Sequence, residues 1–216
     1  NVIQRLLVSS LIIPYVYRSG DVGTGFGLAV TDIDFRLQRR REYLGAFASY
    51  TTRKQQDYVL SWRRWLHSID LEGGGVLQEE RSFVRAKAGY RKTLTRRFFG
   101  FGPDSLEEDE SSYTDEVFFL GLGSALALPV PFDDVVFDLD LTSEFHQLDD
   151  GTVEDRPSMR DSFPAIFAAD ETANLGVLSL GLRWDTRDSQ SNPYGGWHAG
   201  AVVDTAFAQT GGEVGA

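Results

Sequence analysis

Residues 135–147 read VVFDLDLTSEFHQ, and in this stretch large apolar side chains alternate with polar ones. A β-strand turns successive side chains to opposite faces of its sheet, so the stretch predicts a strand with one face in an apolar environment and the other in water. The apolar side chains are Phe137, Leu139, Leu141 and Phe145. The opposite face carries the carboxylates of Asp138, Asp140 and Glu144.

The same two-residue period recurs from one end of the chain to the other. Further strands are expected at residues 11–18, 24–37, 43–53, 56–66, 71–79, 83–94, 117–128, 175–187 and 197–207. Most of these segments have about ten residues and are separated by Gly, Asp, Ser, Asn or Pro. The sequence therefore predicts an all-β chain, a single domain over residues 1–216, with roughly ten antiparallel strands in up-and-down order.

Composition and charge narrow the classes of function. The formal net charge is −11, and no run of Lys or Arg is long enough to follow a phosphate backbone, which makes nucleic acid a poor partner. The chain has no cysteine, which excludes disulfides and thiol catalysis. The longest charge-free stretch, residues 118–132, contains two glycines and two prolines and is too short for a spanning helix. If the chain crosses a membrane, we expect it to cross as strands.

Alternation alone does not separate a membrane barrel from a soluble sandwich, because a sandwich also has one apolar face. Segment length favours the barrel, since a tilted spanning strand needs about 9–11 residues and soluble strands are commonly nearer 5 or 6. Aromatic residues at strand ends, where the interfacial girdles of a barrel lie, favour it too. They are Tyr43, Trp62, Trp65, Tyr113, Phe145, Trp184 and Trp197. A soluble all-β binding domain remains an alternative.

Residues 180–197, LGLRWDTRDSQSNPYGGW, add a motif to the alternation. An Asp-x-Arg-Asp segment is followed by Pro and Gly and then by a new strand; its residues are Asp185, Arg187, Asp188, Pro193, Gly195 and Gly196. This pattern resembles the bacterial surface antigen family of outer-membrane β-barrels, the superfamily of BamA and TamA. Residues 96–116, RRFFGFGPDSLEEDESSYTDE, and residues 12–30, IIPYVYRSGDVGTGFGLAV, are similar to two further family segments in the same order.

The resemblance implies a transmembrane β-barrel in the outer membrane of a Gram-negative bacterium. Such barrels usually have sixteen strands, so we expect this chain to be the N-terminal part of the barrel, truncated at both ends. Leu180, Leu182 and Trp184 would face outer-membrane lipid together with the apolar face of residues 135–147. The motif residues and the carboxylates would face the lumen, where Asp185, Arg187 and Asp188 either brace an inward loop or belong to a charge-balanced wall.

The function implied by the resemblance is assembly, insertion or translocation of client outer-membrane proteins through a weak barrel seam, with periplasmic modules as further partners. Gly23, Gly25 and Gly27 either weaken that seam, because glycine destabilises strands, or merely relieve crowding. A passive outer-membrane porin is the alternative function, with Asp138, Asp140 and Glu144 lining its pore.

An enzyme is not expected. The three histidines, His67, His146 and His198, are scattered, and no Gly-x-Ser-x-Gly elbow is present. The segment GTGFG at residues 23–27 is not followed by a predicted helix, so it predicts no phosphate cradle. Acidic loops are expected at residues 102–116 and 149–164, and the segment 104–116 lacks EF-hand spacing. We therefore predict no catalytic residue, no cofactor and no metal site.

Overall fold

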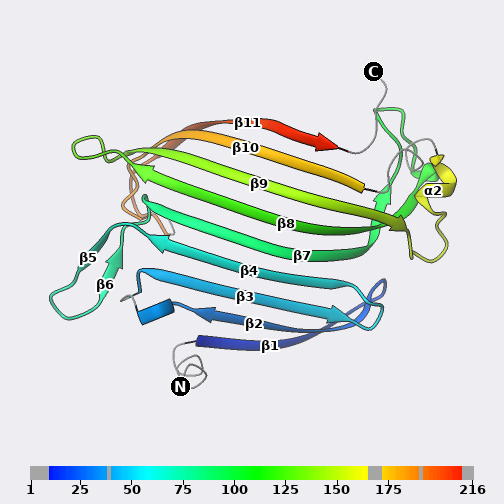
Figure 1. Cartoon of the computed structure of the whole chain (residues 1–216), viewed down its shortest axis with the longest axis horizontal. Helices are drawn as coiled ribbons and strands as arrows, with labels where there is room; N and C mark the ends of the chain where they lie inside the picture. The colour runs from blue at the N-terminus through cyan, green and yellow to red at the C-terminus, as the bar shows by residue number, and fades with distance from the viewer. Residues whose placement is uncertain (1–9, 38–39, 165–171, 190–191, 211–216) are drawn as a thin grey trace.

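The computed structural model describes residues 10–37, 40–164, 172–189 and 192–210 of the chain. Nine strands form one antiparallel sheet in the order β1-β2-β3-β4-β7-β8-β9-β10-β11 (Figure 1). Their bounds are β1 (Ser10–Ser19), β2 (Gly23–Asp32), β3 (Glu42–Thr51), β4 (Gln56–Trp65), β7 (Phe83–Phe98), β8 (Ser111–Ala127), β9 (Val135–Asp150), β10 (Thr172–Asp185) and β11 (His198–Thr210). The predicted all-β, antiparallel, up-and-down fold is confirmed.

The sheet is open. Strands β1 and β11 lie at its opposite edges, and within the described residues each pairs with only one neighbour. The described residues form fewer strands than the sixteen that the family resemblance implies, and these strands do not close into a barrel.

The prediction of one strand over residues 71–79 is wrong. The chain instead forms a small separate hairpin from β5 (Ser68–Asp70) and β6 (Val76–Gln78), which projects from the main sheet between β4 and β7 (Figure 1). Gly74 and Gly75 turn the chain between the two short strands with φ of +79° and +115°, a backbone conformation that only glycine adopts readily.

The strands extend into both acidic segments, and this shortens the first loop relative to the expected residues 102–116. Strand β8 already begins at Ser111 and β9 runs to Asp150. Short helical turns, η2 (Glu107–Asp109) and α2 (Met159–Ser162), lie in what remains of these loops, and a third, η1 (Phe35–Leu37), follows β2. The second loop is fixed to the sheet because the backbone N–H of Ser112 donates to the carbonyl of Pro157 at 2.9 Å.

The strand register divides the side chains between two faces. On one face, which we call the apolar face, Leu139 lies opposite Leu180 and Phe137 lies opposite Leu182. On the other, which we call the polar face, Asp140 lies opposite both Gly123 and Ser179. A shift of one residue would exchange the two faces, so the alternation of the sequence fixes this register.

Little of the apolar surface is buried. The buried apolar side chains of the described part are Val22, Leu94, Val117, Ala125, Val136 and Met159. Within this part, no helix combines the length and the apolar character that crossing a bilayer requires. Since a sheet normally covers its apolar face with another layer, this sheet needs some other apolar surroundings.

Candidate functional site on the two faces of the sheet

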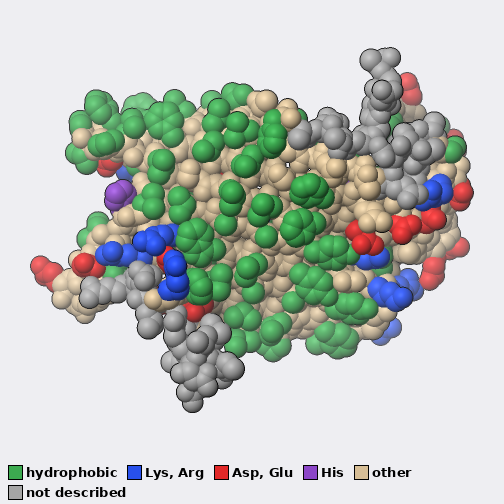
Figure 2. All heavy atoms as spheres, viewed as in Figure 1, with side chains coloured by type: hydrophobic (Ala, Val, Ile, Leu, Met, Phe, Trp, Pro, Cys, Tyr) green, Lys and Arg blue, Asp and Glu red, His purple; other side chains and the backbone are tan. Residues whose placement is uncertain are grey.

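The apolar face is continuous over the middle of the sheet (Figure 2). All seven residues predicted to face lipid lie on it, with exposures between 37% for Leu141 and 53% for Leu180. Monomeric soluble proteins rarely expose contiguous apolar patches larger than a few hundred Å². Figure 2 shows apolar side chains spread across the sheet, with the charged ones gathered toward the two ends of the strands.

Charged side chains limit the apolar face at both ends of β4. At one end Arg64 pairs with Glu42, 3.0 Å away, and Arg36 binds the same carboxylate. At the other end Gln56 lies opposite Lys92, which pairs with Glu116. Arg64 is eight residues beyond Gln56, a distance of about 26 Å along the strand, or about 20 Å if the strand is tilted by 40°.

Aromatic pairs lie near these same two limits. Trp184 and Trp197 meet edge to face at one end, with ring centroids 4.5 Å apart. At the other end Tyr58 stacks with Tyr90, whose hydroxyl donates to Glu116 at 2.6 Å. Aromatic rings with one polar edge suit a boundary between apolar and aqueous surroundings.

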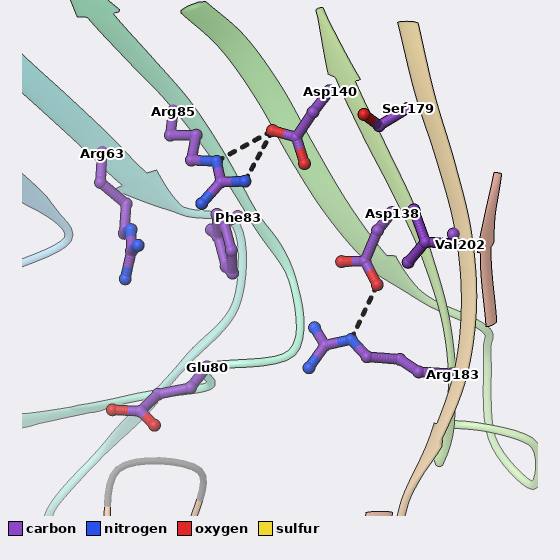
Figure 3. Close-up of a pocket in the computed structure, with 10 residues that line it drawn as sticks. Arg63, Glu80, Phe83, Arg85, Asp138, Asp140, Ser179, Arg183 and Val202 are labelled. Carbon is purple, nitrogen blue, oxygen red and sulfur yellow. Dashed lines mark hydrogen bonds and ion pairs between the residues drawn. The ribbon is translucent and has the colours of Figure 1, made fainter. Parts of the chain in front are cut away.

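The polar face pairs the predicted carboxylates with arginines of other strands. Asp138 accepts from Nε of Arg183 at 2.9 Å, and Asp140 accepts from Nε and Nη2 of Arg85 at 3.1 and 2.6 Å (Figure 3). Gly123 lies beneath the second pair: a Cβ on it would come within 2.0 Å of the Asp140 carboxylate. The two arginines and the two carboxylates line an open cavity of about 450 Å³.

Glu144 lies further along the polar face, beside His146. The imidazole Nε2 is 3.3 Å from Glu144, and Nδ1 is 2.9 Å from Asp115. The structure does not bring the three carboxylates predicted for the lumen into one cluster, since each has its own cationic or imidazole neighbour. Among the described residues, no group of His, Asp and Glu could hold a metal ion.

Asp185 ends β10 in a fully buried position. Its carboxylate accepts from Nε and Nη2 of Arg187, both at 2.8 Å, and from Nη1 of Arg183 at 3.3 Å. The backbone carbonyl of Arg187 accepts from Arg81 at 3.2 Å, which connects this turn to the segment before β7. Asp185 and Arg187 therefore stabilise the turn and also join the charged network of the polar face.

Asp188 holds the turn that leads into β11. One carboxylate oxygen accepts from the backbone N–H groups of Ser189, Tyr194 and Gly195 at 2.9, 3.0 and 3.3 Å. Hydrogen bonds from Tyr194 and Gly195 lower the pKa of this carboxyl below its usual value. Gly196 has φ of +90°, and a Cβ there would lie 2.4 Å from the carbonyl oxygen of Thr186.

Pro193 is exposed in this same loop, just before Tyr194. The motif of residues 185–196 thus encodes the β10–β11 turn, a role that could be argued from its Asp, Pro and Gly content.

The predicted seam glycines lie in β2, one strand inside the β1 edge. Tyrosine rings of β1 lie over two of them: a Cβ on Gly25 would be 2.3 Å from the Tyr17 ring, and one on Gly27 would be 2.0 Å from the Tyr15 ring. Gly23 has φ of +79° at the β1–β2 turn. The register places both tyrosines opposite their glycines, a packing that agrees with relief of crowding at Gly25 and Gly27.

The comparisons with known proteins give no match: no protein-family model, no curated protein and no solved structure matches the chain.

Proposed function

We propose that the chain is part of the wall of an outer-membrane β-barrel of the surface antigen type. The observation that carries this proposal is the exposed apolar face, limited at both ends of the strands by charged pairs and aromatic rings. The apolar band of such barrels is about 25 Å tall, and the spacing of about 20–26 Å along β4 is close to that height.

The polar face supports the same proposal. Arg85, Arg183, Asp138 and Asp140 require water or ion pairing, and they find both on a wall whose other side faces lipid. Hydrocarbon does not tolerate unpaired backbone groups, so the free edges of β1 and β11 must pair with further strands in the membrane. We propose that these strands come from the same protein.

We further propose that the complete barrel assembles, inserts or translocates client outer-membrane proteins. A free strand edge can accept another strand by backbone hydrogen bonding, and the edge of β1 is such a site within the described residues. This part of the proposal is supported by the motif resemblance of residues 12–30, 96–116 and 180–197.

A passive outer-membrane porin is the second candidate. Its support is the charged polar face, where ion pairs would line an aqueous channel and an open cavity of about 450 Å³ would form part of it.

The membrane proposal is tested by placing one charge on each face at neighbouring positions of β10. Leu180→Arg puts a cation on the apolar face, where it should cost about 2–4 kcal/mol near the bilayer midplane, whereas Ser179→Arg puts it on the polar face. Both variants are refolded into lipid vesicles, and insertion is followed by quenching of tryptophan fluorescence with brominated lipid. We expect Leu180→Arg to insert poorly and Ser179→Arg to insert like the unmodified chain.

Equal insertion of the two variants, or a monodisperse chain that needs no detergent, would overturn the membrane proposal in favour of a soluble all-β domain. Inserted protein that conducts ions steadily, without accelerating the folding of an added outer-membrane protein, would support the porin. Acceleration of that folding would support the assembly function.

A further inference from the structure

A second cavity, of about 440 Å³, lies on β3, β4 and β7 beside the cavity of Figure 3. Its walls include Tyr43, Ser61, Arg63, Trp65, Arg85 and Lys87. Arg63 lies directly opposite Arg85, and Ser61 lies opposite Lys87, so the register of β4 and β7 gathers three cations at one place. Like charges on facing strands repel, and among the described residues that line this cavity none is acidic.

Among the described residues only Arg85, of these three cations, forms an ion pair with a carboxylate, and Glu80 acts on Arg63 through charge alone. Arg85 is bound to Asp140, whereas the Arg63 guanidinium lies 4.5 Å from the centre of the Phe83 ring and forms no ion pair within the described part of the chain (Figure 3). Lys87 is likewise 5.2 Å from the centre of the Phe119 ring, with no carboxylate partner there. The aromatic rings hold these two cations in place but do not supply hydrogen-bond acceptors.

The cavity also has an unpartnered donor. The indole Nε1 of Trp65 is buried and has no hydrogen-bond acceptor among the described residues. A buried N–H without an acceptor is unfavourable. The hydroxyl of Ser61 donates to the carbonyl of Gly45 at 3.3 Å, which orients it within the same wall.

We propose that this cavity binds the oxyanion group, phosphate or carboxylate, of a small solute. Arg63 offers the paired N–H groups that fit such an oxyanion, and Lys87 adds a second positive charge. The site gives the polar face a ligand of its own, which goes beyond the proposed function and does not depend on it.

The test is a titration with inorganic phosphate, glycerol phosphate and acetate at constant ionic strength, followed by calorimetry and by tryptophan fluorescence. The variants are Arg63→Gln and Lys87→Gln. The control is Arg91→Gln, which removes the same charge from the polar face at a residue that is paired with Asp57 3.4 Å away and does not line the cavity. Circular dichroism establishes that each variant is folded, and Arg63→Lys replaces Arg63→Gln if the latter does not fold.

We expect saturable binding of at least one of the three anions, weakened about tenfold or more by Arg63→Gln and by Lys87→Gln, which corresponds to about 1.4 kcal/mol. Arg91→Gln should change the affinity less than about twofold. Preference for glycerol phosphate over inorganic phosphate would identify a phosphate ester, and preference for acetate a carboxylate. Equal weakening in all three variants, or no saturable binding of any anion, would overturn the proposal.

Discussion

Gly27→Ala distinguishes a packing role of the β2 glycines from a role in weakening the barrel seam. An added Cβ would lie 2.0 Å from Cζ of Tyr15 and 2.2 Å from its hydroxyl oxygen. The ring cannot move freely, because it stacks on Phe47 at 5.7 Å and on Tyr17 at 6.1 Å. Normal contact needs about 3.5 Å or more, so the ring must shift by about 1.5 Å.

The two roles predict opposite signs for the change in the free energy of unfolding. Overpacking typically costs about 1–3 kcal/mol, while replacing glycine by alanine restricts the unfolded chain and returns about 0.4–1 kcal/mol. We therefore expect Gly27→Ala to lower the free energy of unfolding by about 1–2 kcal/mol. If the glycine only weakens the strand, the same substitution should instead stabilise it by about 0.5–1 kcal/mol.

The assay is denaturant unfolding followed by tryptophan fluorescence, in a double-mutant cycle with Tyr15→Ala. Removing the ring should make Gly27→Ala neutral or stabilising, with a coupling energy of about 1.5–3 kcal/mol. Gly20→Ala is the matched control, since a Cβ at Gly20 meets no heavy atom within 4 Å. A Gly27→Ala variant that is more stable than the unmodified chain would refute the packing role, as would a cycle without coupling.

Further predictions concern the polar face and the β10–β11 turn. Asp185→Asn should lower the free energy of unfolding by about 1.5–3 kcal/mol, because the substitution removes the buried carboxylate that pairs with Arg187. An unchanged denaturation midpoint would contradict this. Because the pKa of Asp188 is lowered in the folded chain, its carboxylate contributes fully to stability above the ordinary carboxyl pKa of 3.8. This stability is lost as the pH falls through the folded pKa. Asp188→Asn should therefore make the free energy of unfolding less sensitive to acid. Gly123→Ala should separate Arg85 from Asp140, since the added Cβ would lie 2.8 Å from Nε of Arg85. The control is Gly73→Ala, whose Cβ has no neighbour within 4 Å and which should leave the unfolding curve unchanged.

The sequence predicts the strands of the main sheet well because both faces of each strand are chemically distinct. Leu180 and Leu182 alternate with Gly181 and Arg183, so a one-residue register error would bury an arginine among apolar side chains. The hairpin of β5 and β6 was not predicted, because residues 71–79 also alternate in part and the turn depends on the positive φ of Gly74 and Gly75.

The cavities could not be predicted from the sequence. Arg63 and Arg85 are brought opposite each other by a register that forms across an irregular connection, and a sequence pattern does not specify such long-range pairs. The Asp140–Arg85 pair likewise depends on the missing side chain of Gly123 in the strand between them. The sequence indicates a motif at Asp185 and Asp188, but it does not show that both carboxylates accept hydrogen bonds from within the turn.

The order of the strands has a consequence for folding. In the main sheet every strand pairs with the next sheet strand along the chain, so the sheet can grow by adding one strand at a time. The connection from β4 to β7, residues 66–82, carries the small hairpin of β5 and β6. Because each doubling of a loop costs only about 0.6 kcal/mol of closure entropy, a reporter peptide inserted into this connection should disturb folding little.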